Sequence, residues 1–95
     1  MTTQDIIQRL TSAKSALFVK YPIKSMAIFG SIARGEAVAE SDVDIVVELN
    51  GQVGLKFVTI ADELEEVLGK KVDLVSRRAI DDRYWKFIEK DLIYV

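Results

Sequence analysis

Asp42 and Asp44 are the residues whose type and spacing most directly suit chemistry in this chain. They stand two positions apart where an apolar, β-branched run begins, so their side chains point to the same side of the expected strand. Carboxylate oxygens held side by side are ligands that Mg²⁺ prefers. A lone Asp-x-Asp pair is also typical of a solvated strand entrance, and the pair by itself leaves both interpretations open.

Asp73 is a third candidate, because it stands inside a separate apolar run over residues 72–75. An ionised carboxylate among buried side chains is costly unless a partner offsets its lost hydration. If the two runs form adjacent strands, Asp42, Asp44 and Asp73 converge into a hard-oxygen site that waters and phosphate oxygens complete around Mg²⁺. Asp73 alone is equally consistent with a strand-edge residue that faces water.

Gly30 and Ser31 follow the abrupt end of another apolar run and suggest a site for an anion. Glycine lets the backbone approach a ligand closely, backbone N–H groups at a helix start favour an anion, and the Ser31 hydroxyl adds a donor. Arg34 lies one turn further along and could reach a phosphate oxygen. An ordinary strand-to-helix turn has the same composition, so Gly-Ser alone is a weak indication.

The amino-acid composition excludes several kinds of catalytic and metal-binding group. The chain has 95 residues with no cysteine and no histidine, which excludes disulfides, thiolate metal ligands and histidine bases from it. Its 49% apolar content supports a core, and we expect a single domain over residues 1–95. The net charge of −2 lacks the basic character of nucleic-acid binders, and no apolar stretch is long enough to span a bilayer. We therefore expect a cytoplasmic protein that binds neither nucleic acid directly nor membranes.

Short apolar runs and stretches of helical periodicity follow one another along the chain. Apolar residues at helical spacing predict helices, β-branched runs predict strands, and Gly69 stands where a helix C-cap belongs. The predicted elements are a helix from 3 to about 18, a strand over 24–29, a helical turn over 32–35, a small-residue loop over 37–41, a strand over 43–49, a helix over 57–68, a strand over 71–75, a helix from 81 to about 90 and an edge strand over 92–95. This order predicts an α/β (α+β) fold, in which a small mixed β-sheet packs against helices.

Two clusters near the C-terminus have no evident place in this chemistry. Tyr84, Trp85 and Phe87 form an aromatic cluster, and Trp and Tyr are common at interfaces. Trp85 and Phe87 are nevertheless expected to pack in the core. Arg77, Arg78 and Arg83 form a local basic patch that could meet phosphate or an acidic partner. A solvated helix face is the more typical setting for such arginines.

The spacing of the candidate residues resembles that of a known superfamily. Gly30-Ser31, ten intervening residues and then Asp42-x-Asp44 are similar to the signature of the DNA polymerase β-type nucleotidyltransferases. The sequence Gly-Lys-Lys-Val-Asp-Leu-Val over 69–75, after an acidic helix, and the final Tyr-Val resemble the minimal nucleotidyltransferase (MNT, MntA-like) antitoxins of prokaryotes. The resemblance covers most of the chain.

This resemblance implies a polymerase β-type nucleotidyltransferase fold and a role for each candidate. Gly30 and Ser31 would hold the triphosphate of ATP or another nucleoside triphosphate, and Asp42 and Asp44 would bind Mg²⁺ as catalytic ligands. Asp73 would be the third catalytic and metal-binding carboxylate. The implied reaction transfers AMP from ATP to a Tyr hydroxyl of a HEPN-domain toxin. The chain would then be a protein adenylyltransferase and the antitoxin of a toxin–antitoxin pair.

Two other functions remain open on the sequence. The chain could be an antitoxin that binds nucleotide but blocks its toxin by contact alone. It could also be the catalytic subunit of a small-molecule nucleotidyltransferase, similar to the aminoglycoside nucleotidyltransferases, with another chain supplying the acceptor site. The three functions differ in whether a nucleotide is transferred and in whether it is found on the toxin or on a small molecule.

Overall fold

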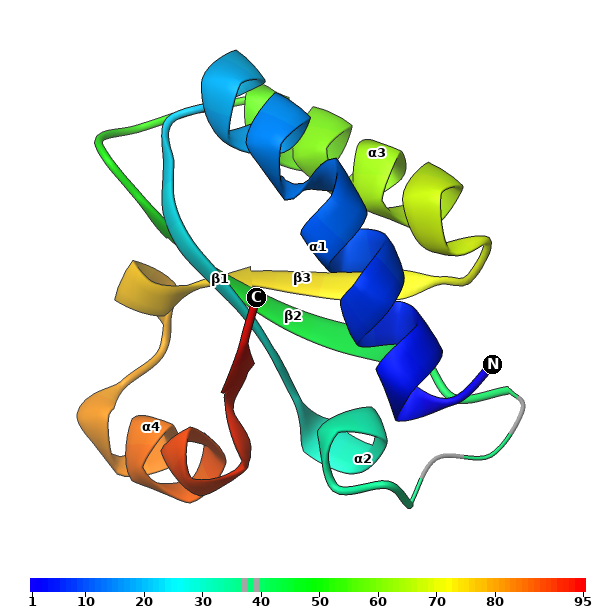
Figure 1. The fold of residues 1–95 in the computed structure, drawn as a ribbon. Coiled ribbons are helices and arrows are strands. Elements are labelled where there is room, and N and C mark those ends of the chain that lie inside the picture. The colour runs from blue at the N-terminus through cyan, green and yellow to red at the C-terminus, as the bar shows by residue number, and fades with distance from the viewer. Residues whose placement is uncertain (37, 39) are drawn as a thin grey trace.

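The computed structural model describes residues 1–36, 38 and 40–95. Ala37 and Ala39, which belong to the loop predicted over 37–41, lie outside the described residues. The predicted helices and strands are present (Figure 1), and the short helix begins at Gly30, two residues before its predicted start. In chain order the elements are α1 (Thr3–Lys20), β1 (Ile23–Phe29), α2 (Gly30–Ala33), β2 (Val43–Leu49), α3 (Lys56–Leu68), β3 (Val72–Ser76), η1 (Arg77–Ala79), α4 (Asp82–Ile88), η2 (Glu89–Asp91) and β4 (Ile93–Tyr94).

The four strands form one mixed sheet in the order β3-β2-β1-β4. β1 runs antiparallel to both β2 and β4, whereas β2 and β3 are parallel and are connected through α3. A parallel neighbour needs such a crossover, since a tight turn can only reverse the chain. The predicted fold class is therefore confirmed, and β4 lies at the predicted edge of the sheet.

The ends of α1 follow from local side-chain and backbone chemistry. Thr2 caps the helix, because its Oγ1 accepts a hydrogen bond from Asp5 N–H while the Asp5 carboxylate accepts one from Thr2 N–H, at 3.1 and 2.9 Å. The helix runs to Lys20, two residues beyond the predicted end. Pro22 restricts only the residue before it, and Tyr21 is accordingly extended.

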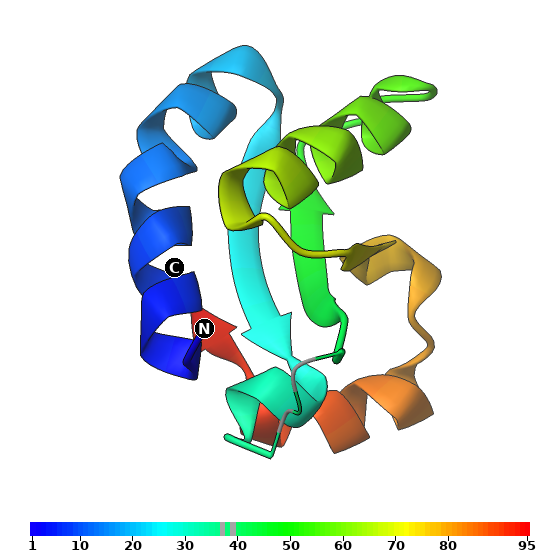
Figure 2. The same ribbon diagram turned by 90° about the vertical axis from the view of Figure 1, so that its right-hand side faces the viewer.

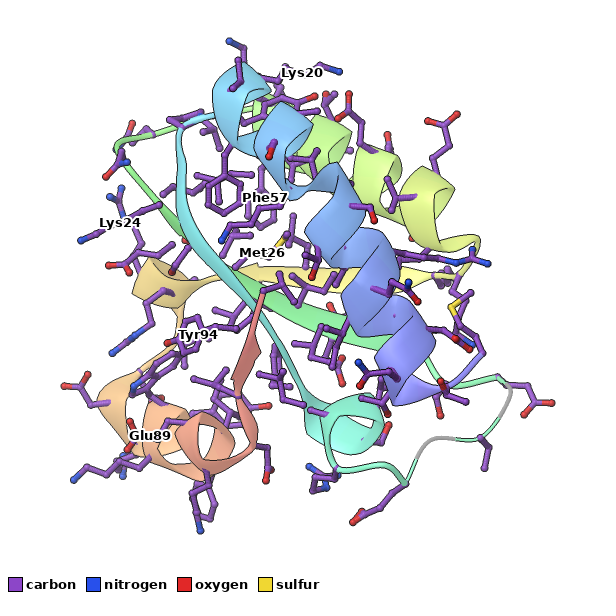
Figure 3. The ribbon with its side chains drawn as sticks, viewed as in Figure 1. Lys20, Lys24, Met26, Phe57, Glu89 and Tyr94 are labelled. Atoms are coloured by element: carbon purple, nitrogen blue, oxygen red, sulfur yellow. The ribbon has the colours of Figure 1, made fainter. Side chains whose placement is uncertain are left out.

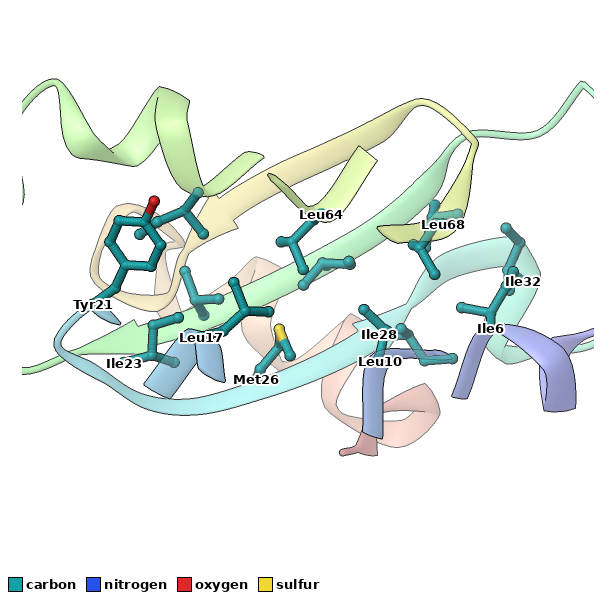
Figure 4. Close-up of a cluster of buried hydrophobic side chains, with 14 residues drawn as sticks. Ile6, Leu10, Leu17, Tyr21, Ile23, Met26, Ile28, Ile32, Leu64 and Leu68 are labelled. Carbon is teal, nitrogen blue, oxygen red and sulfur yellow. The ribbon is translucent and has the colours of Figure 1, made fainter. Parts of the chain in front are cut away.

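α1 and α3 cover one face of the sheet, which we call the α1/α3 face (Figures 1 and 2). An ion pair of 2.5 Å between Lys20 Nζ and Glu63 Oε1 joins the two helices at the surface. Gly69 ends α3 as predicted, in the left-handed conformation, with its N–H bonded to Glu65 O. The core cluster of this face is drawn in Figure 4 and contains Ile6, Leu10, Leu17, Tyr21, Ile23, Met26, Ile28, Ile32, Val43, Ile45, Val47, Ile60, Leu64 and Leu68.

The opposite face of the sheet, which we call the α4 face, has a smaller buried cluster. It contains Ala27, Phe29, Val46, Ile80 and Ile88. In both ribbon views α4 lies apart from α1 and α3, at the end of the molecule where α2 lies (Figures 1 and 2). No helix of the described residues is long and apolar enough to cross a membrane.

The two aromatic residues that the sequence assigned to the core have different positions on α4. Trp85 is half-buried against the small cluster, so its core role is confirmed, and the Arg77 guanidinium lies 4.0 Å from the centre of its ring. Phe87 is 70% exposed, and the prediction that it packs in the core is wrong. α4 is short, and the side that meets the sheet is filled by Trp85 and Ile88.

Candidate active site

The register of two parallel strands brings two of the candidate carboxylates together. Asp44 of β2 is paired directly with Asp73 of β3. Val43 and Ile45, on either side of Asp44, are buried in the α1/α3 core, so alternation along the strand directs Asp44 to the α4 face. Both carboxylates line the same pocket. The structure thus juxtaposes two acids that are 29 positions apart in sequence.

Asp42 lies close to this pair without completing a cluster of three ligands. It stands just before β2 and is exposed, and its charge raises the pKa of Asp44. Within residues 1–36, 38 and 40–95, no three His, Cys, Asp or Glu side chains are grouped so that they could hold a metal ion. The three-carboxylate arrangement expected from the sequence therefore exists as a close pair, Asp44 and Asp73, with Asp42 at its margin.

Asp44 carries the electrostatic cost of this arrangement. Its partial burial raises its pKa above the ordinary value, and the negative charges of Asp73 and Asp42 raise it further, while Arg34 opposes them. Of the two settings that the sequence left open for Asp73, the structure shows the strand-edge residue that faces water. β3 is an edge strand, so Asp73 is exposed to solvent, whereas Asp44 is on an interior strand and is half-buried.

The donor set fits a hard divalent cation. Mg²⁺ usually takes one or two protein carboxylates and completes its octahedron with waters and substrate phosphates, so the pair Asp44 and Asp73 is sufficient as protein ligands. The negative charge of Asp73 contributes to the raised pKa of Asp44, and a positive ion between the two carboxylates would offset this repulsion.

Gly30 is required at its position by its contact with Asp44. Its φ angle is +76°, a left-handed conformation that other residues rarely adopt. A Cβ atom added to Gly30 would collide with the Asp44 carboxylate. Phe29, the preceding residue, is paired with Asp44 across β1 and β2, which explains the close approach. Gly30, which the sequence linked to anion binding, therefore also allows the backbone after β1 to pack against the Asp44 carboxylate.

A pocket of about 750 Å³ joins these residues to the C-terminal part of the chain. Of the six residues that the sequence selected, five line the pocket, and these are Gly30, Ser31, Arg34, Asp44 and Asp73. The other side is formed by residues that sequence reasoning missed, which include Tyr84, Phe87, Lys90 and Asp91. The sequence shows that Tyr84 and Phe87 are spaced to lie on the same face of a helix. It does not show that this face lines the pocket of Asp44 and Asp73.

Arg34 lies in the pocket but is paired with carboxylates. Its Nε donates to Glu36 Oε2 at 3.1 Å and its Nη1 donates to Asp91 Oδ2 at 3.3 Å. The side chain is exposed, so both ion pairs are screened by water and can be exchanged for a phosphate oxygen. The second pair also ties α2 to η2, on opposite sides of the pocket.

The basic patch of the sequence lies elsewhere. Arg77, Arg78 and Arg83 do not line the pocket that contains Asp44. Arg77 instead stacks on Trp85 and donates from Nη1 to Ile80 O at 3.3 Å, which fixes α4 against the end of β3. These contacts hold parts of the fold together. Arg77 therefore does not lie on a solvated helix face, which is the setting that the sequence favoured for the three arginines.

Comparison with known sequences agrees with this site. The family described as the nucleotidyltransferase domain matches residues 10–95, and the chain belongs to that family. A Methanocaldococcus jannaschii protein provisionally named as a protein adenylyltransferase is 44% identical over 98 residues, covering 99% of this chain and 98% of that protein. The protein adenylyltransferase MntA of Thermococcus cleftensis is 34% identical over 96 residues, covering 100% of this chain and 97% of its own length.

Solved structures share the fold. One provisionally described as a minimal nucleotidyltransferase superimposes with a TM-score of 0.84 at 31% identity, covering 98% of this chain and 95% of that one. The Shewanella oneidensis complex of a tri-AMPylated HEPN toxin with its MNT antitoxin matches with a TM-score of 0.69, covering 94% of this chain and 70% of the matched one. Its 19% identity shows the fold alone. Within the nucleotidyltransferases, the chain is therefore a minimal, MntA-like member.

Proposed function

We propose that this chain transfers AMP from ATP to a tyrosine hydroxyl of a HEPN-domain toxin, and that it is the antitoxin of that pair. The observation that carries the proposal is the Asp44–Asp73 pair, held against the Gly30 backbone inside a pocket of about 750 Å³. The relative named MntA is a protein adenylyltransferase, and the fold is shared with an MNT antitoxin in complex with an AMPylated HEPN toxin.

In this proposal the β1–α2 junction holds the triphosphate. The backbone of Gly30 and Ser31 lines the pocket beside the acids, and the Ser31 hydroxyl offers a further donor. Arg34 exchanges its carboxylate partners for a phosphate oxygen. Lys90 lines the same pocket and adds positive charge. These cations and donors offset the charge of a triphosphate that approaches two carboxylates.

The two carboxylates direct the transfer. Mg²⁺ held by Asp44 and Asp73, with Asp42 beside them, would neutralise the phosphates and lower the pKa of the acceptor hydroxyl. Asp73 is exposed and accepts the hydroxyl proton. The tyrosine oxygen forms a bond to the α-phosphorus, the bond from that phosphorus to the bridging oxygen breaks, and pyrophosphate leaves.

The acceptor comes from a second molecule. A volume of about 750 Å³ lies within the range of single-ligand pockets and suits one nucleotide. The net charge of −2 does not favour a nucleic-acid acceptor, whose binding depends on phosphate neutralisation. A docked protein presents a hydroxyl at high effective concentration, which suits a small enzyme whose candidate active-site pocket has room for one nucleotide.

Intact-mass spectrometry of the partner tests the proposal. With ATP and Mg²⁺, the HEPN-type partner is expected to gain one or more masses of AMP, together with release of pyrophosphate. The variant Asp42→Ala/Asp44→Ala should give no adduct. The variant Asp62→Ala/Glu66→Ala, which removes two acids from α3 outside the pocket, is the matched control and should modify the partner normally.

Two outcomes would contradict the proposal, and each would support a different function. Neutralisation of the partner without a mass change in ATP and Mg²⁺ would indicate an antitoxin that acts by contact. An adduct found only on a small molecule would indicate a subunit of a small-molecule nucleotidyltransferase.

A further inference from the structure

Two large aromatic side chains of α4 face the candidate active site rather than the core. Tyr84 is 53% exposed and Phe87 is 70% exposed, and they stand one helical turn apart. Both line the pocket that contains Gly30, Asp44 and Asp73. Exposed aromatic surface of this extent is uncommon for a helix whose other apolar residues are packed, and it calls for a partner with an apolar face.

The helix that carries them is fixed to the sheet. Asp81 caps α4, with its Oδ1 accepting from Tyr84 N–H at 2.8 Å and its carbonyl accepting from Trp85 N–H at 2.9 Å. Trp85 and Ile88 pack into the buried cluster of the α4 face, and Arg77 stacks on Trp85. The two rings are therefore presented by an anchored element, and a ligand that meets them does not have to order the helix first.

The chemistry of the pocket differs between its two sides. The side formed by β1, α2, β2 and β3 carries most of the polar groups, which are Gly30, Ser31, Arg34, Asp44 and Asp73. The side formed by α4 and η2 presents the rings of Tyr84 and Phe87, and its charged residues are Lys90 and Asp91. Lys90 Nζ lies 6.0 Å from the centre of the Phe87 ring. A nucleoside triphosphate has the same division, with a flat apolar base at one end and charged oxygens at the other.

We propose that Tyr84 and Phe87 form the base subsite, where the nucleobase stacks while the phosphates lie at Gly30 and Ser31. This inference rests on the proposed function and adds the part of the site that holds the base. Stacking accepts any base, because every base has a π-face. The subsite therefore supplies affinity for the nucleoside and little discrimination between purine bases.

Calorimetry with two ligands tests the subsite. A non-hydrolysable ATP analogue contains the base, and inorganic tripolyphosphate lacks it, so a base contact affects only the first. In the presence of Mg²⁺, the variant Tyr84→Ala/Phe87→Ala should weaken binding of the analogue by roughly 5- to 150-fold, the range for loss of one stacked base. Its affinity for tripolyphosphate should be unchanged. Ser31→Ala should weaken both ligands.

Three controls keep the result specific. Tyr84→Phe should bind the analogue as the wild type does, because stacking needs the ring and not the hydroxyl. Tyr94→Ala removes a comparably exposed tyrosine of β4 (Figure 3). Tyr94 lies outside this pocket and lines another one together with Trp85, so its loss should change neither affinity. The analogue with guanine in place of adenine should bind the wild type within a few-fold of the adenine analogue.

The outcomes separate this inference from the proposed function. If the wild type binds the analogue and the double alanine variant binds it equally well, the base subsite is wrong while the nucleotide site stands. If that variant instead loses the HEPN-type partner, the aromatic pair belongs to a protein interface and the inference is overturned. If the wild type binds neither ligand, the proposed function itself fails.

Discussion

The two faces of the sheet are covered in different ways. On the α1/α3 face, two long helices and the sheet together bury fourteen side chains of the described residues. A capping box begins α1, and an ion pair between Lys20 and Glu63 joins α1 to α3. On the α4 face, a helix of seven residues covers a cluster of five. That face also carries Asp44, Asp73 and two exposed aromatic rings.

The difference shows that one sheet serves two purposes. Apolar burial on the α1/α3 face supplies most of the folding free energy, since stabilisation follows the apolar area removed from water. The incomplete cover on the α4 face leaves room for a pocket, and it holds two carboxylates in a repelling arrangement that raises the pKa of Asp44. Substitutions on the two faces should therefore affect different properties.

Asp44→Asn should separate activity from folding most clearly. The change keeps the shape of the side chain but removes the negative charge that would hold a divalent cation beside the triphosphate. Transfer is expected to fall by at least about 10²–10³-fold, as for loss of a preorganised charge-stabilising group. The rate of AMP incorporation into the partner measures this, with circular dichroism to show that the fold is intact. Near-normal transfer would remove Asp44 from the catalytic assignment.

Leu64→Ala should have the opposite effect. Leu64 is fully buried on the α1/α3 face, and its truncation should lower the free energy of unfolding by about 2–5 kcal/mol. Leu92→Ala, on the α4 face, should cost less because Leu92 is only half-buried. Urea denaturation gives both values. The folded Leu64→Ala protein should keep its activity at low temperature, and a selective loss of activity would contradict the division between the faces.

Gly30→Ala and Gly69→Ala form a matched pair. Both glycines have positive φ angles, +76° and +65°, so each alanine should cost about 1–2 kcal/mol in stability. Only at Gly30 does the added methyl group meet another residue, the Asp44 carboxylate, and nothing lies within 4 Å of it at Gly69. Transfer should therefore fall, by on the order of 10²-fold for a displaced reacting group, only in Gly30→Ala. Equal activities would show that the position of Asp44 is not critical.

The smallest effect is a gain in stability from neutralising Asp44. Its pKa in the folded protein is raised, so its charged form disfavours folding at neutral pH. Without divalent cations, Asp44→Asn should melt a few degrees above the wild type at pH 7. The difference should shrink as the pH falls through the folded-state pKa of Asp44 and vanish below about 3.9, the value of an unfolded aspartate.

Melting curves from pH 3.5 to pH 8 in a chelator check this. Asp62→Asn, an exposed change on α3, is the control and should show no such gain. A lower melting temperature for Asp44→Asn at neutral pH would mean that Asp44 is stabilised by contacts that outweigh its burial and its acidic neighbours.

The sequence by itself determined the elements and much of the site. Apolar periodicity, β-branched runs and caps such as Thr2 and Gly69 act within a few residues, so they indicate where helices and strands begin and end. Alternation along a strand likewise indicates the face on which Asp44 lies, whereas Asp42 stands just before β2 and outside the pocket. The spacing from Gly30-Ser31 to Asp42-x-Asp44 was enough to indicate the family to which the chain belongs.

Only the tertiary structure decided how these pieces meet. The pairing of Asp44 with Asp73 depends on the register of β2 and β3, two strands that α3 separates in sequence, and no local pattern contains that register. The burial of Asp44 rather than Asp73 follows from the order of strands in the sheet. The exposure of Phe87 follows from the side of α4 that meets the sheet. Each depends on contacts between segments far apart in the chain, and such contacts are set by the packing of the whole core.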